Sequence, residues 1–109
     1  MKTLKLLAVL GAVTVTFWPL HKATADEALA KKNGCFACHA IDHKVVGPAY
    51  LDVAAKYKGD SSAVDALTKT VLHGGGGVWG DVPMPPNVAV SPDNARKLVE
   101  WILSLNASK

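Results

Sequence analysis

Cys35-Phe36-Ala37-Cys38-His39 is the stretch on which the rest of this 109-residue chain depends. Two cysteines separated by two residues and followed at once by histidine form the attachment pattern of a c-type haem. On a helical turn, Cys35 and Cys38 lie on one face, so both thiols can reach the two vinyl groups of one porphyrin. The histidine that follows can direct its imidazole at the iron. We therefore predict one haem c, bound covalently through Cys35 and Cys38, with His39 as an axial ligand.

The same spacing has other interpretations. A disulfide between Cys35 and Cys38 would close a very small loop and would constrain the chain little. A thioredoxin-like dithiol requires a βαβ context that this sequence lacks, and a zinc site requires more ligands than two cysteines and scattered histidines. These alternatives stay open beside the haem interpretation.

The segment before the motif has the features of a secretory signal peptide. Lys2 and Lys5 precede an apolar run over 6–18, and Ala23-Thr24-Ala25 matches the A-x-A pattern at which such leaders are cleaved. An uncleaved membrane anchor is the alternative, but the apolar run is shorter than the roughly 20 residues that cross a bilayer. We predict a cleaved signal peptide over 1–25 and a single haem-binding domain over 26–109, with no membrane span in the mature chain.

The net positive charge of the chain comes from that leader. The chain has 12 Lys and Arg and 9 Asp and Glu, but Lys2, Lys5 and Lys22 precede residue 26. The mature domain therefore has equal numbers of basic and acidic side chains, and its composition gives no support for a nucleic-acid partner. A domain of this size has a marginal apolar core, which a buried porphyrin would enlarge.

The rest of the domain is predicted to be helical. Helices are expected over 26–32, 50–57, 62–72 and from Pro92 onward, and no segment alternates as a strand would. We therefore predict an all-α fold of four to five short helices around one covalently attached haem.

Caps and apolar stripes support these helix limits. Ser62 with Asp65 has the pattern of a capping box, and Ser91 before Pro92 is typical of a helix start. Trp101 is expected at the margin of the apolar stripe of the last helix. That stripe consists of Ala95, Leu98, Val99, Ile102 and Leu105.

A second ligand is predicted in the loop 82–87, whose sequence is Val-Pro-Met-Pro-Pro-Asn. Three prolines exclude a helix or a central strand and give a rigid loop that can hold one side chain in place. Met84 is the only methionine besides the initiator Met1. A thioether opposite a histidine raises the reduction potential of haem iron and leaves no open axial position. We predict Met84 as the second axial ligand, with apolar filling of the loop as the alternative.

Several motifs, in order, resemble the small bacterial class I cytochromes c of the cytochrome c-551 type. The resemblance covers nearly all of 26–109 and implies a compact helical bundle around a haem with one exposed edge. It also implies an electron carrier and not an enzyme. The matching segments are 34–42 around the haem motif, Val46-Gly47-Pro48-Ala49-Tyr50, Gly77-Val78-Trp79-Gly80 and Pro83-Met84-Pro85-Pro86-Asn87.

The resemblance further implies roles for residues around the haem. The carbonyl of Pro48 would accept a hydrogen bond from His39, and Asn87 would lie beside the sulfur of Met84. The indole N–H of Trp79 would meet a haem propionate, with ordinary packing as the alternative. Relatives often have an arginine or histidine near the propionates where this chain has Thr70, so a pH-dependent potential is not carried over.

Partners and location are also implied by the resemblance. Relatives carry electrons between periplasmic redox proteins, commonly toward nitrite reductase or a terminal oxidase. We expect a periplasmic monomer that docks transiently at the exposed haem edge through a small interface. His43 and His73 are expected to be solvated. Five lysines can steer acidic partners, although plain solvated surface is the alternative for each: Lys31, Lys32, Lys44, Lys56 and Lys58.

Two other classes of function stay open on the residues alone. A haem enzyme or gas sensor would keep the sixth position of the iron open, and a thiol or zinc protein would bind no haem.

Overall fold

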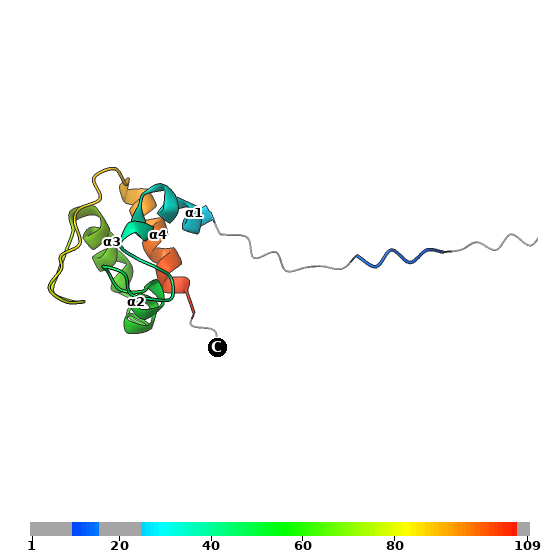
Figure 1. The fold of residues 1–109 in the computed structure, drawn as a ribbon, viewed down its shortest axis with the longest axis horizontal. Coiled ribbons are helices and arrows are strands. Elements are labelled where there is room, and N and C mark those ends of the chain that lie inside the picture. The colour runs from blue at the N-terminus through cyan, green and yellow to red at the C-terminus, as the bar shows by residue number, and fades with distance from the viewer. Residues whose placement is uncertain (1–9, 16–24, 107–109) are drawn as a thin grey trace, which may run out of the picture.

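The computed structural model describes residues 10–15 and 25–106. These residues form four α-helices and one short 3₁₀ turn, and their only β-type contacts are two isolated bridges (Figure 1). The all-α prediction is therefore confirmed, with helix limits that differ from the predicted ones by about one residue. In order, the elements are α1 (Ala25–Lys32), the 3₁₀ turn (Cys35–Ala37), α2 (Tyr50–Lys56), α3 (Ala63–His73) and α4 (Pro92–Ser104).

Helix α4 is the centre of the bundle, because it packs against α1, α2 and α3 (Figure 1). Its start matches the prediction: the Ser91 hydroxyl accepts a hydrogen bond from the backbone N–H of Asn94 at 3.2 Å, and Pro92 occupies the first turn. Its apolar stripe is buried through Ala95, Leu98, Val99 and Ile102.

The position of Trp101 differs from the prediction. We expected this side chain at the margin of the stripe, but it is 7% exposed and belongs to the core. The reason is α2, whose Tyr50 ring meets the indole edge-on, with ring centroids 5.7 Å apart and an interplanar angle of 81°. A partner helix on that side widens the buried face of α4 beyond the stripe read from its sequence.

Helix α1 ends as its sequence indicates, and this ending positions the cysteine motif. Both the backbone N–H and the side-chain amide of Asn33 donate to the carbonyl of Leu29, at 3.1 and 2.9 Å. Gly34 then adopts a positive φ of 73°, which glycine tolerates well, and the chain turns into the 3₁₀ turn at Cys35.

The start of α3 corrects another prediction. Ser62 has helical dihedral angles and makes no side-chain cap, so the predicted capping box with Asp65 is absent. Asp60 supplies the local order, because its carboxylate accepts from both the backbone N–H and the hydroxyl of Ser62, at 2.9 and 2.6 Å. These bonds lower the pKa of Asp60.

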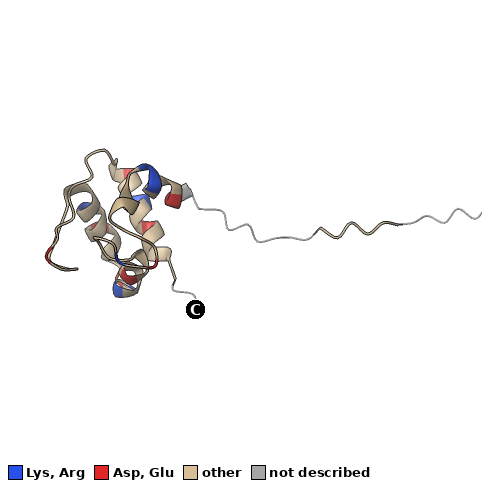
Figure 2. Cartoon of the chain, in the orientation of Figure 1, with Lys and Arg blue, Asp and Glu red and all other residues tan. Residues whose placement is uncertain are grey.

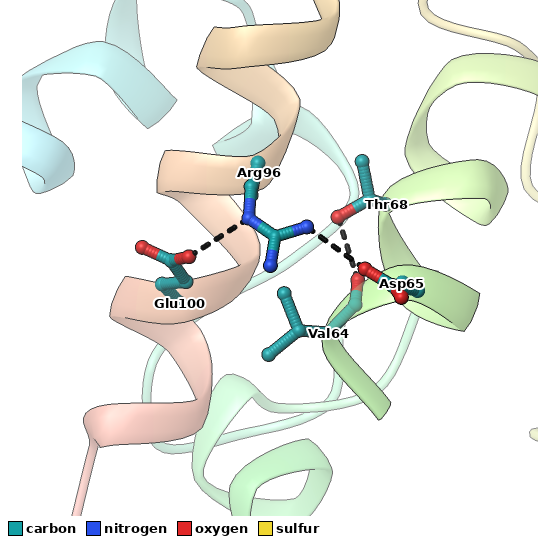
Figure 3. Close-up of polar contacts among 5 residues, drawn as sticks. All are labelled: Val64, Asp65, Thr68, Arg96 and Glu100. Carbon is teal, nitrogen blue, oxygen red and sulfur yellow. Dashed lines mark hydrogen bonds and ion pairs between the residues drawn. The ribbon is translucent and has the colours of Figure 1, made fainter. Parts of the chain in front are cut away.

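Asp65 has a different partner, on α4. Figure 3 shows Arg96 between the two helices, donating to Asp65 of α3 at 2.8 Å and to Glu100 of α4 at 3.1 Å. The bond to Asp65 is the main cause of the raised pKa of Arg96. All three side chains are exposed, so these ion pairs contribute little to the stability of the fold.

The predicted signal peptide over 1–25 lies largely outside the described residues. Residues 10–15, which are described, form no regular secondary structure. Within the described ranges, no helix is long and apolar enough to cross a membrane. Figure 2 shows basic and acidic residues interspersed along the helices, whereas the loop between α3 and α4 has Asp81 as its one charged residue.

Candidate functional site

A cleft of about 320 Å³ opens between the cysteine motif, helices α2, α3 and α4, and the long loop that follows α3. Its wall is largely apolar, with Val53 from α2, Leu67 and Val71 from α3, and Leu98 and Ile102 from α4 among its residues. All seven residues predicted for the site line this one cleft: Cys35, Cys38, His39, Pro48, Trp79, Met84 and Asn87.

The cysteine motif forms one side of the cleft. Within it, the backbone N–H groups of Cys38 and His39 both donate to the carbonyl of Cys35, at 3.2 and 3.0 Å, which closes the turn. Both thiols are free and half-buried. Burial raises the pKa of the Cys35 thiol, and its hydrogen bond with Tyr50 opposes that rise.

The imidazole of His39 is held by the chain immediately after it. Its Nδ1 lies 2.8 Å from the carbonyl oxygen of Pro48, which can only accept, so Nδ1 donates and Nε2 is the ring nitrogen that can offer a lone pair in the neutral imidazole. Gly47 makes this approach possible, because a Cβ atom there would lie 2.4 Å from Cε1 of the ring. The backbone N–H of Gly47 donates to the carbonyl of Cys38 at 2.7 Å and so holds the loop against the motif.

Met84 reaches the cleft from the other half of the chain. Gly75 and Met84 form an antiparallel bridge, with Gly75 donating at 3.1 Å and Met84 donating at 2.7 Å. Gly74 joins this bridge to the end of α3 with φ 80° and ψ 171°, a region that only glycine occupies readily. The rigid loop therefore has its position set by the last turn of α3.

Asn87 also connects this loop to α3. Its backbone N–H and its side-chain Nδ2 both donate to the carbonyl of Val71, at 3.1 and 3.0 Å. The hydrogen bond from Nδ2 uses one of the two N–H groups of the Asn87 side-chain amide. The expected contact between Asn87 and the sulfur of Met84 stays a prediction.

Trp79 lies at the mouth of the cleft and is 39% exposed. The Nζ atom of Lys56 lies 5.6 Å from the centroid of the indole ring and 6.0 Å from that of Tyr57. This cation–π contact links the end of α2 to the loop after α3. Thr70 also lines the cleft, and its hydroxyl donates to the carbonyl of Ala66 within α3.

Tyr50 is a site residue to which the sequence analysis gave no role, although it begins a predicted helix and ends the matching segment 46–50. Its ring stacks on the imidazole of His39, with centroids 4.9 Å apart and an interplanar angle of 22°. The signal available in the sequence was its place two residues after Pro48, which puts it in the first turn of α2 beside the histidine loop.

His43 and His73 are exposed, as predicted.

The donors present fit a haem. The cleft is large and mostly apolar, and its wall includes two thiols that can anchor a haem covalently. The wall also includes an imidazole and a thioether, which are the kinds of axial ligand that haem iron takes. Its volume is within the range of about 300–1,000 Å³ typical of cofactor sites. In the described part of the chain, no group of three or more His, Cys, Asp or Glu side chains is arranged to hold a metal ion.

Comparison with known proteins agrees with this geometry. A family model described as Cytochrome c matches residues 25–106. The chain is 54% identical over 83 residues to the cytochrome c-551 of Allochromatium vinosum, an alignment that covers 76% of this chain and 88% of that protein. It is 50% identical over 105 residues to the cytochrome c-552 of Hydrogenobacter thermophilus, covering 96% of this chain and 99% of that protein.

Solved structures give the same result. The crystal structure of the wild-type cytochrome c552 of Nitrosomonas europaea superposes with a TM-score of 0.71 at 52% sequence identity. The superposition covers 72% of this chain and 98% of that one.

Proposed function

Since this chain belongs to the cytochrome c family and is a small electron-transfer cytochrome with one haem c bound through Cys35 and Cys38, we propose that His39 and Met84 are the two axial ligands of its iron. The protein is an electron carrier and not an enzyme. The observation that carries the proposal is that these two side chains, from opposite halves of the chain, line the same cleft as the two cysteines.

The surroundings of His39 support its role. Donation from Nδ1 to the carbonyl of Pro48 leaves the lone pair of Nε2 for a metal and makes the imidazole a stronger donor. In this proposal Pro48 is a positioning residue. Trp79 and Asn87 complete the site, Trp79 at the cleft mouth toward a propionate and Asn87 beside the Met84 loop.

The proposed ligand pair accounts for the kind of reaction. Haem supplies one-electron chemistry at its iron. With haem bound, His39 and Met84 would both hold the iron and would leave no position on it for a substrate. The His39 imidazole is held by its hydrogen bond to Pro48, and the backbone of Met84 is held by its bridge to Gly75, so the positions of both residues need change little between the two oxidation states.

Electron exchange is proposed to occur at the mouth of the cleft. Exposed apolar side chains surround this mouth, with Val46 50%, Val78 57% and Val82 67% exposed. A small apolar surface suits a brief encounter with another redox protein, and Lys44 at the cleft wall suits an acidic partner. We propose periplasmic redox partners, such as a nitrite reductase or a terminal oxidase, and a monomeric carrier.

Export is part of the same proposal. The basic start, apolar run and Ala23-Thr24-Ala25 site of residues 1–25 support a signal peptide, and covalent haem attachment is usual outside the cytoplasm. We propose that the working protein is 26–109 in the periplasm.

Absorption spectra of the holoprotein test the ligand pair. The oxidised protein should show the weak thioether–iron charge-transfer band toward the red, and the reduced protein should not react with carbon monoxide. Met84→Ala should abolish the band and allow carbon monoxide to bind, while the covalent haem stays attached.

Two outcomes would contradict the proposal. Rapid uptake of carbon monoxide by the wild-type protein would mean an open sixth position and would favour a gas-binding or catalytic haem protein. A Met84→Ala protein that keeps the charge-transfer band would exclude Met84 as its source.

A further inference from the structure

Tyr50 is the first residue of α2 and is only 4% exposed. Its ring lies almost parallel to the imidazole of His39, at 22° with centroids 4.9 Å apart. Two other rings hold it in this position, Trp101 edge-on at 5.7 Å and Phe36 tilted at 5.9 Å. The tyrosine therefore presents a fixed flat surface to the imidazole.

The hydroxyl of Tyr50 adds a further restraint. It is a hydrogen-bond partner of the Cys35 sulfur, and burial, with a smaller contribution from Cys35, raises the pKa of the phenol well above its usual value. The phenol therefore stays neutral. Its ring spans the distance between the first cysteine of the motif and the histidine.

One hydrogen bond does not fix the orientation of an imidazole ring. The bond from Nδ1 to the carbonyl of Pro48 restrains one atom of His39 and leaves the ring free to rotate about the line of that bond. A flat neighbour in near-parallel contact removes this freedom, because rotation would drive the edge of the imidazole into the face of the phenol.

We propose that Tyr50 is a positioning residue that sets the plane of the His39 imidazole, and with it the orientation of this ligand on the haem iron. The proposal rests on the proposed function in taking His39 as a ligand. It assigns orientation to the ring of Tyr50 and only a secondary, anchoring role to its hydroxyl.

Proton NMR of the oxidised holoprotein tests this proposal, because the order and spread of the four haem methyl resonances depend on the plane of the axial imidazole. Tyr50→Leu, which removes the ring, should change the order or compress the spread of these resonances. Tyr50→Phe, which keeps the ring, should retain the wild-type pattern. Phe36→Leu is the comparison: it removes one of the two rings that hold Tyr50 but leaves the stacked ring itself in place, so it should change the resonances less than Tyr50→Leu does.

Unchanged methyl resonances in Tyr50→Leu, or an equal change in Phe36→Leu, would overturn the proposal. A second measurement needs no variant: nuclear Overhauser contacts between the rings of Tyr50 and His39 are expected in the reduced wild-type protein. Their absence would overturn the proposal even if Tyr50→Leu fails to fold. Failure of the underlying function is distinguishable, since the wild-type protein would then bind carbon monoxide or show no ligand signals from His39.

Discussion

At the scale of single residues, the space beside the His39 imidazole is filled by backbone. A Cβ atom on Gly47 would lie 2.4 Å from Cε1 and 2.8 Å from Nδ1 of the ring. Two other sides of the ring are also occupied, because its Nδ1 donates to Pro48 and its face packs on Tyr50. Any side chain at position 47 must therefore displace the proposed iron ligand.

We expect Gly47→Ala to destabilise the holoprotein by about 1–3 kcal/mol, the usual cost of overpacking. Chemical denaturation followed by circular dichroism measures this loss, and the NMR signals of the His39 ring should shift. Gly76→Ala is the control, since its Cβ would meet Pro83 at an ordinary 3.4 Å. Wild-type stability and signals in Gly47→Ala would contradict the clash.

The kinds of donor in the site and the hydrogen bond from His39 to Pro48 could be predicted from the sequence, but the support given by Tyr50 could not. Cys35, Cys38 and His39 form a local pattern, and Met84 is the only methionine of the sequence besides Met1. The stacking of Tyr50 on His39 depends on how α2 packs, which no spacing in the sequence specifies.

At the scale of elements, the end of α3 determines where the methionine loop lies. A Cβ atom on Gly74 would lie 2.6 Å from the carbonyl oxygen of Met84. The bond between Asn87 and Val71 fastens the far side of the same loop to α3. The loop therefore moves with the last turn of that helix.

We expect Gly74→Ala to displace Met84 and to weaken the thioether–iron charge-transfer band, with partial uptake of carbon monoxide by the reduced protein. Absorption spectroscopy measures both effects. Gly59→Ala is the matched control: Gly59 also has a positive φ, 79°, but a Cβ there meets nothing within 4 Å. Gly59→Ala should lose stability and keep the band, and an equal loss of the band in both variants would contradict the steric explanation.

The cap of α4 gives a second prediction for an element. Ser91→Ala removes the side-chain acceptor for the N–H of Asn94 and should cost about 1 kcal/mol, measured by thermal or chemical unfolding. Ser62→Ala is the comparison, because Ser62 precedes α3 without capping it and should cost less. A larger loss at Ser62 would mean that its bond to Asp60 matters more than a true cap.

Helices could be predicted well because their signals are local. Asn33-Gly34 ends α1, and Ser91-Pro92 starts α4, as their sequences indicate. The two corrections have different causes: the Ser62 hydroxyl bonds to Asp60 instead of capping α3, which is a local effect, and α2 buries Trp101, which is a tertiary one. Neither changed the helix limits by more than about one residue.

At the scale of the whole molecule, the protein core has few large side chains that are fully buried. The largest fully buried side chains of the described residues are Leu98 and Val99, and both also line the cleft. Much of the apolar surface that helices α2, α3 and α4 turn inward therefore faces the cofactor site. The haem is expected to supply a large part of the burial that stabilises this small domain.

We expect the chain to lose its cooperative fold when haem cannot attach. A Cys35→Ala/Cys38→Ala double variant should show a greatly reduced helical signal in far-ultraviolet circular dichroism and no sigmoidal thermal transition. The wild-type holoprotein is the control. A double variant that stays helical, unfolds cooperatively and binds no haem would show that the protein core suffices alone.

The central position of α4 also orders events during biosynthesis. The three earlier helices each pack on this last helix. A chain that is synthesised from its N-terminus therefore cannot complete its helical bundle until α4 has been made. Cys35 and Cys38 precede α4 in the sequence and are synthesised well before that moment. Both thiols are therefore still accessible for covalent attachment of haem while the polypeptide is open.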